Sequence, residues 1–129
     1  MAGEIRSFRD LRVYQEAFEV QQHIFDLSKT WPKEEKYALI DQIRRSSRSI
    51  GGNVAESWAK RRYPSHFLSK LTDADGELQE TSHWLRTAMA CGYISPKDEP
   101  LLQSRLAQIG KMLGKMMEIP EKFAPAGEF

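Results

Sequence analysis

The feature that most constrains the fold is the spacing of apolar residues, which recur every three or four positions over most of the chain. This spacing places them on one face of an α-helix, and no stretch shows the alternation that is typical of a β-strand. Four amphipathic helices are therefore predicted, at about residues 10–29, 33–61, 65–91 and 96–118. The predicted core residues are Leu11, Tyr14, Phe18 and Phe25 in the first helix; Leu39, Ile43, Ile50 and Val54 in the second; Phe67, Leu71, Leu78, Leu85 and Met89 in the third; and Leu102, Leu106, Ile109, Leu113 and Met116 in the fourth.

Local signals for helix ends separate these segments. Ser7 and Asp10 resemble a capping box, and Gly92 suits the position just after a helix. Ser95, followed by Pro96 and an acidic residue, is a strong start signal. Short connections place neighbouring helices antiparallel. The sequence therefore predicts an all-α fold, an antiparallel up-down-up-down four-helix bundle, with an irregular helical array as the alternative.

Length and composition favour a single domain over residues 1–129. Hydrophobic residues make up 40% of the chain and charged residues 29%, which excludes a disordered chain and a membrane protein. No apolar run approaches the roughly 20 residues that span a bilayer, and the N-terminus lacks the apolar stretch of a secretion signal. The expected location is the cytoplasm. Residues 120–129 are expected to form a flexible tail.

The sequence contains none of three motifs typical of enzymes, namely a Gly-rich phosphate loop, Gly-x-Ser-x-Gly and a zinc-binding cysteine pair. A di-iron bundle needs two Glu-x-x-His pairs, and the chain has one, Glu80 to His83, which is predicted to face away from the core. Glu19 and His23 also lie outside the apolar seam. We therefore expect a protein that is not an enzyme, with no cofactor, metal or small-molecule substrate. A metal-dependent bundle enzyme is a remote alternative.

The middle of the second predicted helix is unusual because Gly51 and Gly52 lie inside its periodic pattern, among many small residues. Each glycine costs about 1 kcal/mol relative to alanine there. Either the helix kinks or bulges at this point, or another helix, from the same bundle or from another subunit, approaches closely. Gly51, Gly52 and Ala55 are therefore predicted to lie at a subunit interface, and so is Trp84, which is predicted to project away from the core.

Self-association is also predicted from apolar residues beside the core seams. Val13, Val20 and Trp84 would be partly exposed in an isolated bundle if the predicted seams are correct. An association between subunits would cover such residues.

Basic residues concentrate in the same part of the second helix. Residues 42–62 contain six basic residues and one acidic residue. On a helical wheel Arg44, Arg48 and Arg62 share one flank, where they could contact the phosphates of RNA or DNA. The alternative is that the arginines form ion pairs with acidic residues of the third helix, Asp75 near its apolar face in particular. The acidic residues of that helix are Asp73, Asp75, Glu77 and Glu80.

Several spaced motifs resemble one known family. They are Phe8-Arg-Asp-Leu11-x-Val13-Tyr14-Gln15-x-Ala17, Gln42-Ile43-Arg44-Arg45, Asn53-Val54-Ala55-Glu56, Trp58 and Gly92-Tyr93-Ile94. Over about residues 6–119 the chain resembles the 23S rRNA-intervening sequence protein family, except that Gly51 and Gly52 stand where the family usually has a proline and a small residue. The resemblance implies an up-down four-helix bundle that forms a ring-like homopentamer. It also implies kinship with the accessory protein of diversity-generating retroelements, which associates with nucleic acid and a reverse transcriptase.

The predicted function is therefore that of a non-enzymatic, homo-oligomeric scaffold, a pentamer by the resemblance. We expect it to bind RNA, DNA or a nucleoprotein partner through its basic surface. The alternative is a purely structural protein–protein interaction module in which the arginines form salt bridges.

Overall fold

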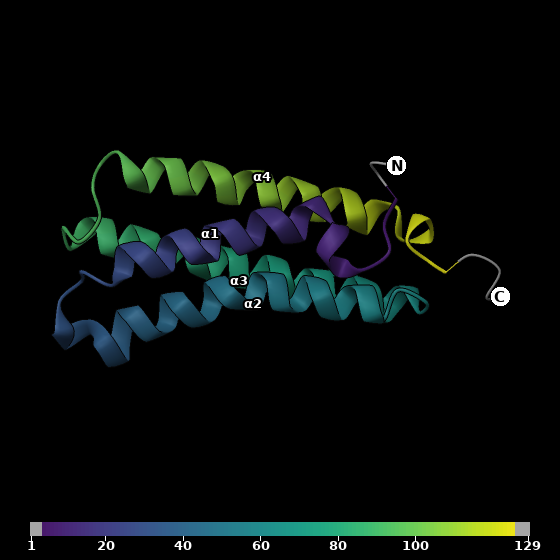
Figure 1. Ribbon diagram of the computed structural model, residues 1–129, viewed down its shortest axis with the longest axis horizontal. Helices are drawn as coiled ribbons and strands as arrows, with labels where there is room; N and C mark the ends of the chain where they lie inside the picture. The colour runs from purple at the N-terminus through teal and green to yellow at the C-terminus, as the bar shows by residue number, and fades with distance from the viewer. Residues whose placement is uncertain (1–3, 126–129) are drawn as a thin grey trace.

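The computed structural model describes residues 4–125 and consists of four long helices. These are α1 (Arg12–Ser28), α2 (Asp41–Ala59), α3 (Pro64–Ala90) and α4 (Asp98–Glu118), and the described residues contain no β-strand. The helices run along the long axis of the molecule in alternating directions, and the α2–α3 turn lies at the same end as both termini (Figure 1). The predicted antiparallel four-helix bundle is confirmed.

The helix-end signals are present, although one caps a different element. The Ser7–Asp10 capping box forms, but it caps the 3-10 turn Phe8–Asp10, and α1 begins only at Arg12. At the start of α4 the Ser95 hydroxyl accepts a hydrogen bond from the Asp98 backbone N–H at 2.9 Å.

The turn after α3 depends on Gly92. This residue has a φ of 78°, a left-handed conformation that glycine adopts without steric cost. The Tyr93 N–H then reaches back to the Ala88 carbonyl at 2.9 Å, which completes a Schellman motif. The Tyr93 hydroxyl donates to Glu35 at 2.9 Å and so ties this turn to the α1–α2 connection.

The second helix begins and ends inside its predicted bounds. Residues Lys33–Glu35 form a 3-10 turn and Lys36–Ile40 a π-helical turn, so α2 itself begins at Asp41. The consecutive residues Leu39 and Ile40 of the π-helical turn are both buried. At its other end α2 stops at Ala59, and α3 begins at Pro64, which requires the residue before it, Tyr63, to be extended.

The core faces of α2 and α4 are those predicted, and four of the five residues predicted for α3 are buried, while Met89 is half-buried. Of the predicted seam of the first helix, only Leu11 is buried, Tyr14 and Phe25 are half-buried, and the prediction is wrong for Phe18. Phe18 is 44% exposed, whereas Val13 and Val20 are 4% and 0% exposed. These valines therefore leave no apolar surface for a subunit contact. The buried residues of α1 are Val13, Ala17, Val20, Ile24 and Ser28.

Small residues of α2 are buried in the bundle, where α2 makes its most extensive contact with α3. Ser46, Ser47 and Ser57 are buried, and each hydroxyl donates to the carbonyl three residues earlier. The Thr81 hydroxyl of α3 donates to the Ser46 hydroxyl at 2.9 Å. Short polar side chains thus let the two helices approach without an unsatisfied buried group among the described residues.

The described part of the tail packs against the core. Pro120–Lys122 form a 3-10 turn, and the Phe123 ring stacks on the buried Phe67 ring with 5.6 Å between centroids. Phe123 therefore extends the core, while the flexibility of the tail stays a prediction. Residues 126–129 lie outside the described residues.

Candidate nucleic-acid interface

Two arginines of α2 converge on one aromatic ring of α1. The guanidinium carbons of Arg44 and Arg48 lie 4.7 Å and 5.4 Å from the Phe25 ring centroid. The Lys29 ammonium lies 4.7 Å from the same centroid, and Arg44 Nε donates to the Ser28 hydroxyl at 2.9 Å. The ring faces attract cations, so Phe25 holds the basic groups together. We call Phe25, Lys29, Arg44 and Arg48 the α1–α2 basic face.

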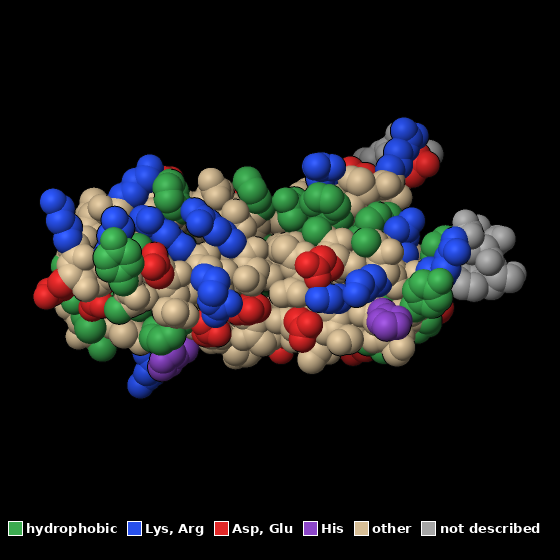
Figure 2. Space-filling view, turned by 90° about the horizontal axis from the view of Figure 1, so that it is seen from below, with side chains coloured by type: hydrophobic (Ala, Val, Ile, Leu, Met, Phe, Trp, Pro, Cys, Tyr) green, Lys and Arg blue, Asp and Glu red, His purple; other side chains and the backbone are tan. Residues whose placement is uncertain are grey.

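The two arginines of this face carry charge that no nearby acid balances. No carboxylate of residues 4–125 lies within ion-pair distance of Arg44 or Arg48, whereas Lys29 pairs with Asp26 at 3.4 Å. Arg48 is exposed and Arg44 half-buried. Lys and Arg side chains gather over the half of α2 nearer its N-terminus, shown on the left in Figure 2. This part of the surface can therefore attract an anionic partner.

Arg45, one residue away, has a different environment. It forms an ion pair with Glu77 at 3.2 Å and a second with Glu80 of α3. Glu80 also accepts a hydrogen bond from Trp84 Nε1 at 3.0 Å. The Trp84 hydrogen bond and then the Arg45 guanidinium hold the pKa of Glu80 below its usual value. The predicted arginine pair with α3 thus exists, but it uses Glu77 and Glu80, and Asp75 forms no ion pair within the described chain.

Arg62 does not join Arg44 and Arg48. Because α2 ends at Ala59, Arg62 lies in the α2–α3 turn, where a helical wheel of α2 no longer applies. At 1.5 Å per residue, Ala59 is already about 16 Å from Arg48 along the helix axis, and Arg62 lies beyond Ala59. The predicted common flank therefore holds for Arg44 and Arg48 and is wrong for Arg62.

The residues predicted at a subunit interface have different environments. Gly51 is buried, and a Cβ atom there would lie 3.4 Å from Cε1 of Tyr14 in the same chain. Gly51 therefore lies against a ring of α1 and presents no outer surface, which corrects its predicted role. Gly52 is exposed, and a Cβ atom there would meet nothing within 4 Å. Ala55 is half-buried.

Neither a kink at the glycines nor an outward Trp84 is observed. The α-helical hydrogen bonding of α2 continues through Gly51 and Gly52, and the irregular turn lies earlier, at Lys36–Ile40. Trp84 is half-buried against the core and fixed by its bond to Glu80, so only part of the ring can contact another subunit.

The other residues with possible chemistry are spread apart or already bonded. Within residues 4–125 no group of three His, Cys, Asp or Glu side chains is arranged to hold a metal ion. Glu80 is engaged by Arg45 and Trp84, and the His83 ring contacts the Trp84 ring edge-on. No helix in this part of the chain is long and apolar enough to cross a membrane.

The profile of one family, the 23S rRNA-intervening sequence proteins, matches residues 9–115, which include the whole α1–α2 basic face. The chain belongs to this family. It is also similar to a crystal structure from Bacteroides thetaiotaomicron, described as a protein of unknown function from the S23 ribosomal protein family. The two share 27% sequence identity with a TM-score of 0.73, over 82% of this chain and 95% of the other. No curated protein matches the chain. Neither matching description names an enzymatic activity.

Phe25 and Lys29 belong to the candidate interface, although the sequence alone does not predict a functional role for them. Phe25 was predicted to be a core residue, and its contact with Arg44 and Arg48 depends on how α1 and α2 are aligned. An aromatic residue followed four positions later by a lysine, on a helix that precedes an arginine pair, is a signal that could have suggested the cluster.

Proposed function

We propose that this protein is a non-enzymatic, self-associating helical scaffold that binds nucleic acid, or a nucleoprotein partner, through the α1–α2 basic face. The observation that carries the proposal is the pair Arg44 and Arg48, which share the Phe25 ring and face no carboxylate within ion-pair distance in the described chain.

The geometry of the pair suits a phosphate backbone. Arg44 and Arg48 lie one turn apart, about 6 Å along the helix axis. A guanidinium presents its N–H groups to phosphate oxygens in a fixed fork, and such contacts carry no sequence information. We therefore expect binding that depends steeply on salt concentration and little on nucleotide sequence.

Self-association would raise the affinity for nucleic acid above the weak affinity of one basic face. Copies of one basic face on a ring raise the overall affinity through effective concentration, without any new contact. Gly52 and Ala55 lie on α2 where another helix could approach, and the exposed part of Trp84 is a further candidate contact. The number five rests on the family resemblance. Light scattering after size exclusion should give about five times the 14.9 kDa chain mass, and a monomer at micromolar concentration would refute self-association.

The nucleic-acid proposal is tested with a charge-matched pair of double variants. Arg44→Gln with Arg48→Gln removes the uncompensated cations, while Lys111→Gln with Lys115→Gln removes two exposed cations one turn apart on α4. An electrophoretic shift assay with RNA and DNA at two salt concentrations should show lost affinity for the first variant only, while both variants keep the helical circular dichroism of the parent protein. If the parent protein binds neither nucleic acid and the arginine variant melts at lower temperature, the structural interaction module is the better description.

A further inference from the structure

A cavity of about 410 Å³ lies at the end of the bundle, between the N-terminal segment, the end of α2 and the C-terminal turn. Its principal lining residues are Ile5, Arg6, Trp58, Arg61, Lys122 and Phe123. This volume falls within the roughly 300–1,000 Å³ typical of small-molecule sites. The cavity is separate from the basic face, because Trp58 follows Arg48 by about 15 Å along α2.

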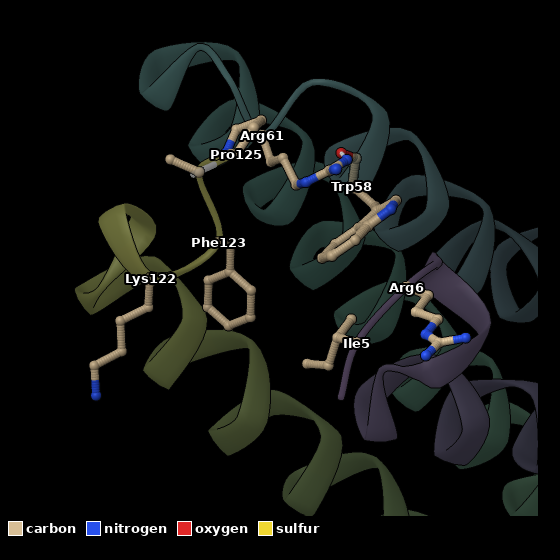
Figure 3. A pocket seen from close by; sticks show the side chains of 8 residues that line it. Ile5, Arg6, Trp58, Arg61, Lys122, Phe123 and Pro125 are labelled. Carbon is tan, nitrogen blue, oxygen red and sulfur yellow. Dashed lines mark hydrogen bonds between the residues drawn. The ribbon is translucent and has the colours of Figure 1, made fainter. Parts of the chain in front are cut away.

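Two aromatic rings form the walls of this cavity. Figure 3 shows the rings of Trp58 and Phe123 on opposite sides of the opening, with Ile5 on a third side. Phe123 is fixed by its stacking on Phe67, and Trp58 is half-buried against the core. Both rings therefore keep their positions without a ligand. A flat ring placed between them would contact both aromatic side chains.

The charge at the cavity is positive. The Arg61 guanidinium carbon lies 3.9 Å from the Trp58 ring centroid, and one of its N–H groups donates to the Trp58 carbonyl at 2.9 Å. Its other N–H groups have no acceptor within residues 4–125. Arg6 and Lys122 lie at the rim and point outward (Figure 3). None of the described lining residues is acidic, although Glu4 pairs with Arg6 at 3.2 Å. An anionic group would therefore find its best partner in Arg61.

An opening with aromatic rings on two sides, beside an arginine with unused donors, matches one chemical class. We propose that the cavity binds a nucleotide unit, with the base between Trp58 and Phe123 and the phosphate on Arg61. The unit has two possible sources, a free mononucleotide or the terminal nucleotide of a strand. Stacking recognises any base, so the site should distinguish bases weakly and depend strongly on the phosphate.

The test uses the full chain and the indole N–H signals of its three tryptophans in a proton–nitrogen NMR spectrum. The Trp58→Phe variant assigns the Trp58 signal. Titration with uridine monophosphate and with adenosine monophosphate should move that signal saturably, and the signals of Trp31 and Trp84 should stay in place. Uridine without phosphate and inorganic phosphate alone should each bind at least tenfold more weakly. Arg61→Gln should weaken mononucleotide binding roughly tenfold or more, since a hydrogen bond to a charged group contributes about 1.5–3 kcal/mol, while Lys111→Gln should have no effect.

Oligonucleotides with and without a 5′-phosphate distinguish the two sources. Saturation by mononucleotide supports a small-molecule ligand, and saturation only by a phosphorylated strand end supports a nucleic-acid end; both agree with the proposal. No saturable movement of the Trp58 signal with any of these probes would overturn it, and so would equal binding of uridine and uridine monophosphate. The Arg44→Gln, Arg48→Gln variant should bind mononucleotide as the parent protein does. The cavity proposal and the proposal for the α1–α2 basic face can therefore fail independently.

Discussion

Replacing Phe123 by alanine tests whether the C-terminal turn is part of the core. Complete burial makes a Phe→Ala change cost about 3–5 kcal/mol, and Phe123 is half-buried with its ring stacked on Phe67. We therefore expect Phe123→Ala to lower the free energy of unfolding by about 2 kcal/mol. For a domain of this size that corresponds to a fall in Tm of roughly 8 °C.

Thermal melting followed by circular dichroism measures this effect, at a fixed protein concentration because assembly shifts Tm. Phe18→Ala is the matched control, since Phe18 is 44% exposed and should cost less than about 1 kcal/mol. If Phe123→Ala melts within 1 °C of the parent protein, the tail does not pack as described. In that case the Phe123 ring does not form a wall of the proposed nucleotide cavity.

The remaining predictions concern pH and assembly. The pKa of Glu80 is lowered by Trp84 and Arg45, so its contribution to stability is present above the usual value of 4.5 and is lost as pH falls through the lowered pKa. Glu80→Gln should therefore reduce the loss of unfolding free energy at acid pH. The effect should be no more than about 1 kcal/mol because the pair is partly exposed. An unchanged loss of stability at acid pH would contradict this. Gly52→Leu should leave the melting of the isolated subunit intact, because a Cβ there meets nothing within 4 Å, but should reduce the oligomer mass. Gly76→Leu on α3, at an equally open glycine, is its control, and light scattering that shows the same mass for both variants would place the interface elsewhere.

The parts of the fold that follow directly from sequence are those with one unambiguous apolar face. Ile43, Ile50 and Val54 on α2 have polar or small neighbours on their other sides, so the period alone identifies them as core. In α1 two adjacent faces are apolar, and only packing decides between them. The branched Val13 and Val20 fill the narrow interior, while larger rings such as Phe25 take the border with α2.

The candidate site was less predictable because it depends on contacts between helices. Arg44 and Arg48 share a flank by helical spacing alone, and this could be predicted. Their common partner Phe25 and the assignment of Arg45 to Glu77 and Glu80 require the alignment of α1 and α3 against α2. Arg62 was misplaced because the predicted helix extended beyond Ala59, where the chain turns toward Pro64.

The salt dependence of nucleic-acid binding tests the central claim most directly. The logarithm of the binding constant falls with the logarithm of salt concentration by about 0.9 per phosphate contacted on duplex DNA and about 0.7 on a single strand. Loss of Arg44 and Arg48 removes two contacts, so the slope for the double glutamine variant should be shallower by roughly 1.4–1.8 per bound subunit. The Lys111→Gln, Lys115→Gln variant should keep the slope of the parent protein. Equal slopes for the parent and the arginine variant, or a change only in the lysine variant, would contradict the assignment of nucleic-acid binding to this face.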